Sequence, residues 1–124
     1  MKITPFSLAA LALVAGVWFG SDANAGTLFA RGAKWSYYKG NEHPSGGDLE
    51  WTESNFDDSD WPSGDTPIRY GDGNGGTVLS DMRYTYSPVF FRRTFNVAKG
   101  AEVSALDLLV NYDDGFVVWI NGEE

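Results

Sequence analysis

From residue 26 onward the chain consists of short apolar or alternating runs separated by clusters of glycine, asparagine, aspartate, serine and proline. The three-to-four-residue periodicity of an amphipathic helix is absent from this region. Short runs between turn-forming residues are typical of β-strands. The sequence therefore predicts an all-β domain with strands at Thr27–Ala30, Trp35–Lys39, Thr77–Leu79, Pro88–Val97, Ser104–Tyr112 and Gly115–Asn121.

Two of the predicted strands show a clear two-residue period. Ser104–Tyr112 carries an apolar residue at every second position, which indicates a strand with one buried face. In the run before it, the residues that share an apolar face are Val89, Phe91 and Phe95. Arg93 falls on that same face, so its side chain must reach a partner or the edge of the sheet.

The last predicted strand is followed by a strong hairpin signal. Asn121-Gly122 favours a type I′ turn, in which both central residues need a positive φ. Only Glu123 and Glu124 follow it in this sequence. We therefore expect the natural protein to continue beyond Glu124, and we expect Gly115–Ile120 to be an apolar edge strand prone to association.

The first 25 residues have the form of a secretory signal peptide. Lys2 precedes a nearly unbroken apolar run from Phe6 to Phe19, and Ala23-Asn24-Ala25 provides small residues at a cleavage position. The run is shorter than the roughly 20 residues that a spanning helix needs. We expect a helix over 6–19 in the precursor, cleavage after Ala25, and a mature chain without a membrane span that is secreted, periplasmic or held at the cell surface.

The negative charge and the absence of cysteine exclude several kinds of partner and site. The net charge is −8, and removal of the leader does not change it because the leader contains one acidic and one basic residue. Such a chain is repelled by phosphate backbones, so we expect no nucleic-acid partner. The absence of cysteine excludes a disulfide framework, a thiolate zinc site and a cysteine nucleophile.

An ordered series of aromatic and acidic motifs spans most of residues 27–124, at Gly32–Tyr38, Phe56–Trp61, Tyr70–Gly73, Phe90–Phe95 and Asp113–Gly122. This series resembles the galactose-binding-like jelly-roll modules of bacterial secreted proteins. The resemblance implies an incomplete jelly-roll β-sandwich over 26–124, preceded by the signal-peptide helix of 1–25. It also implies that Trp35, Phe56, Trp61 and Phe91 are core or corner aromatics.

The carboxylates and the histidine of the chain do not form a catalytic pattern. Asp57, Asp58 and Asp60 form one acidic group and Asp113-Asp114 another, and aspartates are frequent in turns because they bond nearby backbone amides. His43 is the one histidine, and a base paired with Ser45 is the less favoured interpretation. We expect no catalytic residue in this part of the protein.

Two binding sites remain as hypotheses. Asp72, Asn74 and Asp81 are oxygen donors around a glycine-rich loop and are candidates for a structural calcium site, although the EF-hand spacing fails. Trp51 and Tyr86 lie in polar, loop-like contexts and are candidates for stacking on a sugar ring. No other cofactor is expected.

These observations predict a non-catalytic accessory module that binds a carbohydrate or cell-surface ligand or packs on a downstream domain of the same polypeptide. Two alternatives stay open. The resemblance extends to modules that precede exported metallophosphoesterases, so the chain could be the N-terminal piece of a hydrolase whose metal ligands lie beyond residue 124. It could also be a structural module of a surface assembly.

Overall fold

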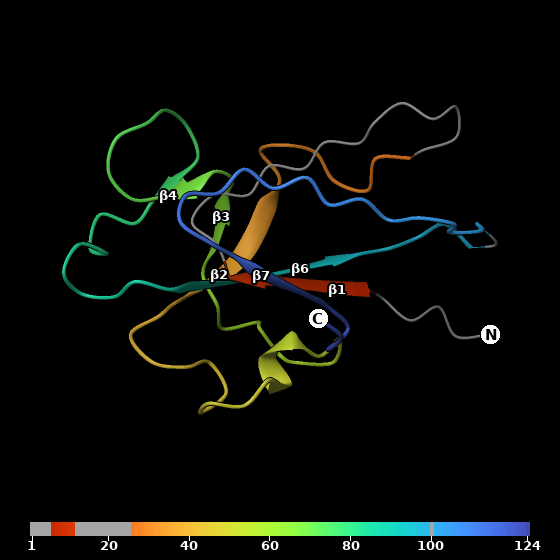
Figure 1. The fold of residues 1–124 in the computed structure, drawn as a ribbon, viewed down its shortest axis with the longest axis horizontal. Coiled ribbons are helices and arrows are strands. Elements are labelled where there is room, and N and C mark those ends of the chain that lie inside the picture. The colour runs from red at the N-terminus through yellow and green to blue at the C-terminus, as the bar shows by residue number, and fades with distance from the viewer. Residues whose placement is uncertain (1–5, 12–25, 100) are drawn as a thin grey trace.

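The computed structural model describes residues 6–11, 26–99 and 101–124. This part of the chain is built mostly of β-strands, with one short turn of 3₁₀ helix (Figure 1). The elements are β1 (Phe6–Leu11), β2 (Lys34–Lys39), η1 (Glu50–Thr52), β3 (Ser63–Asp65), β4 (Ile68–Arg69), β5 (Thr77–Val78), β6 (Val89–Phe95) and β7 (Val117–Ile120). The prediction of an all-β protein is confirmed at this level.

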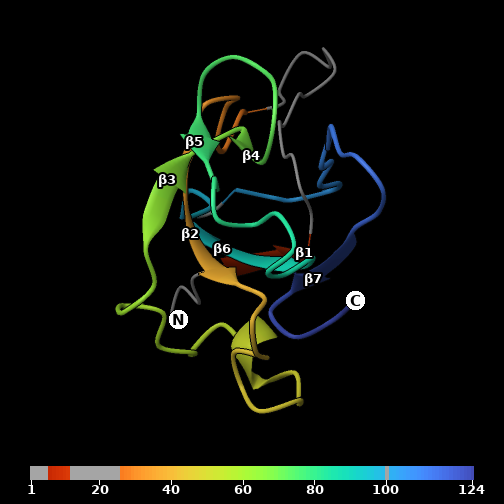
Figure 2. The same cartoon turned by 90° about the vertical axis from the view of Figure 1, so that its left-hand side faces the viewer.

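The main sheet has five strands in the order β3-β2-β6-β1-β7, with antiparallel neighbours throughout. β4 and β5 form a separate two-stranded parallel pair, seen beside β3 in Figure 2. The pair is tied to the main sheet by the Thr77 hydroxyl, which donates to the carbonyl of Asp65 at 3.0 Å. No room remains for a side chain at Gly64, where an added Cβ would lie 2.3 Å from that hydroxyl oxygen.

Apolar side chains pack on both faces of the main sheet. The first cluster consists of Phe29, Trp35, Ile68, Leu79, Met82, Tyr86, Val89, Phe91 and Phe95. The second cluster consists of Trp51, Phe90 and Trp119, with Tyr38, Phe56, Trp61 and Val117 against it. Because successive residues of a strand point to opposite faces, β6 supplies Phe91 to the first cluster and Phe90 to the second.

Four predicted strands are confirmed, and two are wrong. Thr77–Leu79, Pro88–Val97 and Gly115–Asn121 contain β5, β6 and β7, and Trp35–Lys39 covers all of β2 except its first residue. Thr27–Ala30 and Ser104–Tyr112 contain no strand. In the second of these, Leu106 and Leu109 are exposed, and the alternating pattern has no neighbouring strand to complete a ladder in the described part of the chain.

The helix expected over 6–19 is wrong for the residues that can be compared. Phe6–Leu11 is an extended strand because β6 and β7 offer it backbone partners on both sides. Tertiary pairing has overridden the local preference of an apolar run that is ambiguous between helix and strand. Residues 12–25, including the predicted cleavage position, lie outside the described residues, so the signal peptide stays a prediction.

The predicted hairpin turn is confirmed. Asn121 and Gly122 have φ of 52° and 84°, as a type I′ turn requires. Ile120 and Glu123 bond each other through both backbone groups, at 2.8 and 3.1 Å. β7 is also an edge strand, as expected, since β1 is its only neighbour in the sheet as described.

None of the described residues belongs to a helix long and apolar enough to cross a membrane.

Candidate functional site

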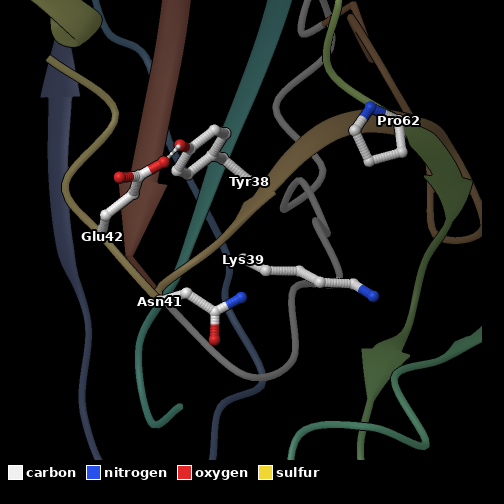
Figure 3. Close-up of a pocket in the computed structure, with 5 residues that line it drawn as sticks. All are labelled: Tyr38, Lys39, Asn41, Glu42 and Pro62. Atoms are coloured by element: carbon white, nitrogen blue, oxygen red, sulfur yellow. Dashed lines mark hydrogen bonds between the residues drawn. The ribbon is translucent and has the colours of Figure 1, made fainter. Parts of the chain in front are cut away.

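A shallow hollow of about 260 Å³ opens where β2 ends and the chain turns away from the sheet. Its lining residues are Tyr38, Lys39, Asn41, Glu42 and Pro62 (Figure 3). Four of them follow one another closely in sequence, so the end of a single strand presents most of the groups. The hollow combines an aromatic ring with an ammonium, an amide and a carboxylate, and therefore offers both hydrogen-bond donors and acceptors.

Tyr38 is the aromatic element of the hollow. Its ring packs on Trp61 with centroids 5.2 Å apart, and its hydroxyl donates a hydrogen bond to Glu42 Oε1 at 3.0 Å. This bond holds the Glu42 carboxylate beside the ring (Figure 3) and raises the pKa of the Tyr38 hydroxyl. An amphipathic ring fixed next to a carboxylate is a suitable surface for a ligand with both apolar and hydroxyl-bearing faces.

Gly40 sets the path of the chain through this turn. Its N–H donates to the carbonyl of Pro88 at 3.0 Å. An added Cβ would lie 2.3 Å from that same carbonyl oxygen, so no other residue fits without moving backbone. The close approach fixes Asn41 and Glu42 at the rim of the hollow.

Lys39, which lines the hollow, forms an ion pair with Asp81 beside it. Its ammonium donates to Asp81 at 2.6 Å, and the hydroxyl of Tyr86 donates to the other oxygen of the same carboxylate at 3.1 Å. The bond from Lys39 is the main cause that lowers the pKa of Asp81. Burial, followed by the bond to Asp81, raises the pKa of Tyr86 to about 12.

The expectation that Trp51 and Tyr86 are exposed is wrong. Trp51 is 1% exposed in the second cluster, and Tyr86 is 8% exposed in the first. Their polar sequence contexts belong to loops that fold back over the sheet, so neither ring offers an open face to a sugar. Among the described residues the aromatic side chain with the largest exposed fraction is that of Tyr84, at 95%, and the guanidinium of Arg83 lies over its ring.

The geometry gives the calcium hypothesis no support. The guanidinium of Arg69 donates to the carbonyls of Gly71 and Gly75, at 2.7 and 3.1 Å, so a cation already lies against the glycine loop that carries Asp72 and Asn74. Asp81 is engaged by Lys39. In the described residues, no group of three or more histidine and acidic side chains is arranged to hold a metal ion.

His43 organises its own loop. Its Nδ1 accepts the N–H groups of Ser45 and Gly47 at 3.4 and 3.1 Å, and its ring lies edge-on to Phe90 at 5.2 Å. The Ser45 hydroxyl donates to the carbonyl of Asp48. These contacts do not join His43 and Ser45 as base and nucleophile.

The acidic group at 57–60 also has structural partners. Asp57 accepts the N–H of Ser59 at 3.0 Å, and hydrogen bonding by Ser59 lowers the pKa of Asp57. Asp58 lies 3.7 Å from Nε of the buried Arg92. The Asp57 contact fits the expectation that these aspartates bond nearby backbone amides in turns, whereas Asp58 forms an ion pair with a residue distant in sequence.

The hollow itself was not predicted from the sequence. The aromatic run at Trp35–Tyr38 and the polar loop that begins at Gly40 are both visible in the sequence, but they indicate a core strand followed by a loop. The missing information was the place of two residues that are distant in sequence: Pro62, which lines the other side of the hollow, and Trp61, which packs on the Tyr38 ring. The signal that could have indicated the site is the aromatic Tyr38 near the end of β2, followed within four residues by Asn41 and Glu42.

Comparison of the chain with protein-family models, with curated proteins and with solved structures finds no match.

Proposed function

We propose that this chain is a non-catalytic accessory module of an exported protein and that it binds a carbohydrate at the hollow formed by Tyr38, Lys39, Asn41, Glu42 and Pro62. The observation that carries the proposal is the Tyr38 ring held beside the Glu42 carboxylate, with Asn41 lining the same open depression. Such a surface can stack on the apolar face of a sugar and bond its hydroxyls.

The shape of the site favours binding over chemistry. The hollow is open, which suits part of a chain-like ligand resting across it better than a small substrate enclosed and shielded from water. The one histidine and the acidic group at 57–60 are committed to loop structure. The jelly-roll fold and export of the protein belong to the same proposal, and they rest on the motif series and the leader in the sequence.

The proposal is tested by screening the full 124-residue chain on a glycan array and by calorimetry with the best ligand. The double variant Asn41→Ala/Glu42→Gln removes the side-chain amide of Asn41 and replaces the charged carboxylate of Glu42 by a neutral amide, and we expect affinity at least about tenfold weaker. The matched control is Asn111→Ala/Glu50→Gln, at two exposed positions outside the hollow. Failure of the parent chain to bind any glycan, or equal weakening in both variants, would contradict the proposal.

A further inference from the structure

The gap between β6 and β7, called the lane here, is one strand wide and is filled by β1. β1 pairs antiparallel with β6 from Phe6 to Leu11 and with β7 from Leu8 to Leu11. Neighbouring strands lie about 4.8 Å apart, so β6 and β7 are about 10 Å apart and cannot bond each other across the gap. The lane accepts a single extended strand that bonds on both sides.

Both walls of the lane are anchored without help from β1. β6 pairs on its other side with β2, from Ser36 to Lys39. β7 is held by the packing of Trp119 on Trp51, with centroids 5.3 Å apart. The hairpin turn after β7 is held by the N–H of Gly122, which donates to the carbonyl of Thr52 at 3.2 Å. Each wall of the lane is therefore held by contacts that do not involve β1.

The walls also define the chemistry of the occupant. On one face they carry Phe91, Phe95, Val118 and Ile120 together with Arg93, and on the other Phe90 and Trp119 together with the buried Arg92 and with Thr94. Both guanidiniums already donate to backbone carbonyls of other segments, so the groups along the walls are predominantly apolar and favour an uncharged, apolar occupant. Phe6–Leu11 reads Phe-Ser-Leu-Ala-Ala-Leu, and its two alanines stand in register with large residues: Ala9 with Trp119 and Ala10 with Phe91.

We propose that the lane is an exchangeable binding site for an extended, uncharged apolar peptide strand, and that Phe6–Leu11 occupies it until the leader is removed. The inference rests on the proposed export only for the event that empties the lane. Strand addition of this kind takes its affinity from main-chain hydrogen bonds and its selectivity from alternate side chains. Loss of the leader leaves the backbone N–H and C=O groups that face the lane on β6 and β7 unpaired. Two unpaired strand edges favour the binding of a partner strand more strongly than one edge does.

The test uses the full chain with a specific protease site inserted between Ala25 and Gly26. The folded protein is cut, and a fluorescent peptide with the sequence of residues 4–13 is added. We expect the peptide to bind one per chain, displacing the leader. A peptide with Ala9→Pro is almost as apolar but lacks one N–H, and we expect it to bind at least about tenfold more weakly.

Three results would overturn the proposal. They are a folded, monomeric cut chain that takes up no peptide, equal binding of the two peptides, and a dimer in which a second copy fills the lane. Glycan binding is measured separately and involves the Tyr38 hollow. A chain that binds no glycan therefore contradicts the proposed function but not the lane, and a chain that takes up no peptide contradicts the lane but not the proposed function.

A second measurement applies if the cut chain does not stay folded. The chain has no cysteine, so the pair Ser7→Cys/Thr94→Cys places two thiols at register partners in the uncut protein. The matched control is Leu11→Cys/Thr94→Cys, four residues and about 14 Å out of register. Preferential oxidation of the first pair within one chain supports occupation of the lane, and equal or absent oxidation overturns it.

Discussion

Arg92 is a charged residue at a position where the strand pattern indicates an exposed side chain. It is 1% exposed, and its guanidinium donates to the carbonyls of Trp51, Glu53 and Phe56. It also lies over the ring of Phe56, 5.1 Å from the centroid. The residue therefore pins the loop after η1 to the second face of the sheet, and burial lowers the pKa of the guanidinium.

Replacement of Arg92 should be among the most damaging changes on the sheet. Arg92→Ala leaves three carbonyls without their donor, and we expect a loss of about 3 kcal/mol or more in the free energy of unfolding. Urea unfolding followed by tryptophan fluorescence measures it. Thr94→Ala, at an exposed position on the same strand, is the control and should cost less than about 1 kcal/mol. Equal losses would show that Arg92 does not hold the loop.

The raised pKa of Tyr86 predicts that the protein loses stability at high pH. Its pKa is about 12 in the folded protein against an ordinary value of 10.0, so the folded state holds the proton more tightly. The contribution of this group is complete below pH 10.0 and is lost as the pH rises to about 12. Unfolding free energies measured across this range should fall in the parent chain. The Tyr86→Phe variant should lack this component of the fall, and identical profiles would contradict the assignment.

At the scale of elements, the turn after β7 depends on backbone conformation. Gly122 has φ of 84°, and an added Cβ would lie 2.4 Å from the Glu53 carboxylate. Gly122→Ala should therefore lower the free energy of unfolding by about 1–2 kcal/mol. Gly115→Ala is the matched control, because nothing lies within 4 Å of an added Cβ there. A Gly122→Ala variant as stable as the control would mean that the turn adopts another conformation.

Elements with local signals were predicted well, and those that depend on distant partners were not. The hairpin turn at Asn121-Gly122 and the shared face of Val89, Phe91 and Phe95 follow from residue types and spacing alone. The reach of Arg93 to a partner was also predicted, and its guanidinium donates to the carbonyl of Lys34.

The wrong predictions concern pairing and burial. Ser104–Tyr112 has the pattern of a strand but no neighbour to pair with, and Phe6–Leu11 was expected in a helix but has two neighbouring strands. Trp51 and Tyr86 lie in polar surroundings in the sequence but are covered by tertiary packing. The hollow at Tyr38 required Pro62 from a distant segment.

At the scale of the whole molecule, β1 joins the two halves of the main sheet. β2, β3 and β6 form one side and β7 the other, and β1 is the strand that pairs with both. The main sheet as described is thus completed by an N-terminal segment whose composition is that of a leader. This arrangement is the central structural claim, since the continuity of the sheet and the proposed strand exchange both follow from it.

Hydrogen–deuterium exchange of the full chain, read by mass spectrometry of its peptides, tests this claim most directly. We expect the amides of Phe6–Leu11 to be protected together with those of β6 and β7, because the three strands bond one another. Residues 101–112, which belong to no strand, serve as the freely exchanging reference. Exchange of Phe6–Leu11 as fast as this reference, with β6 still protected by β2, would contradict the account.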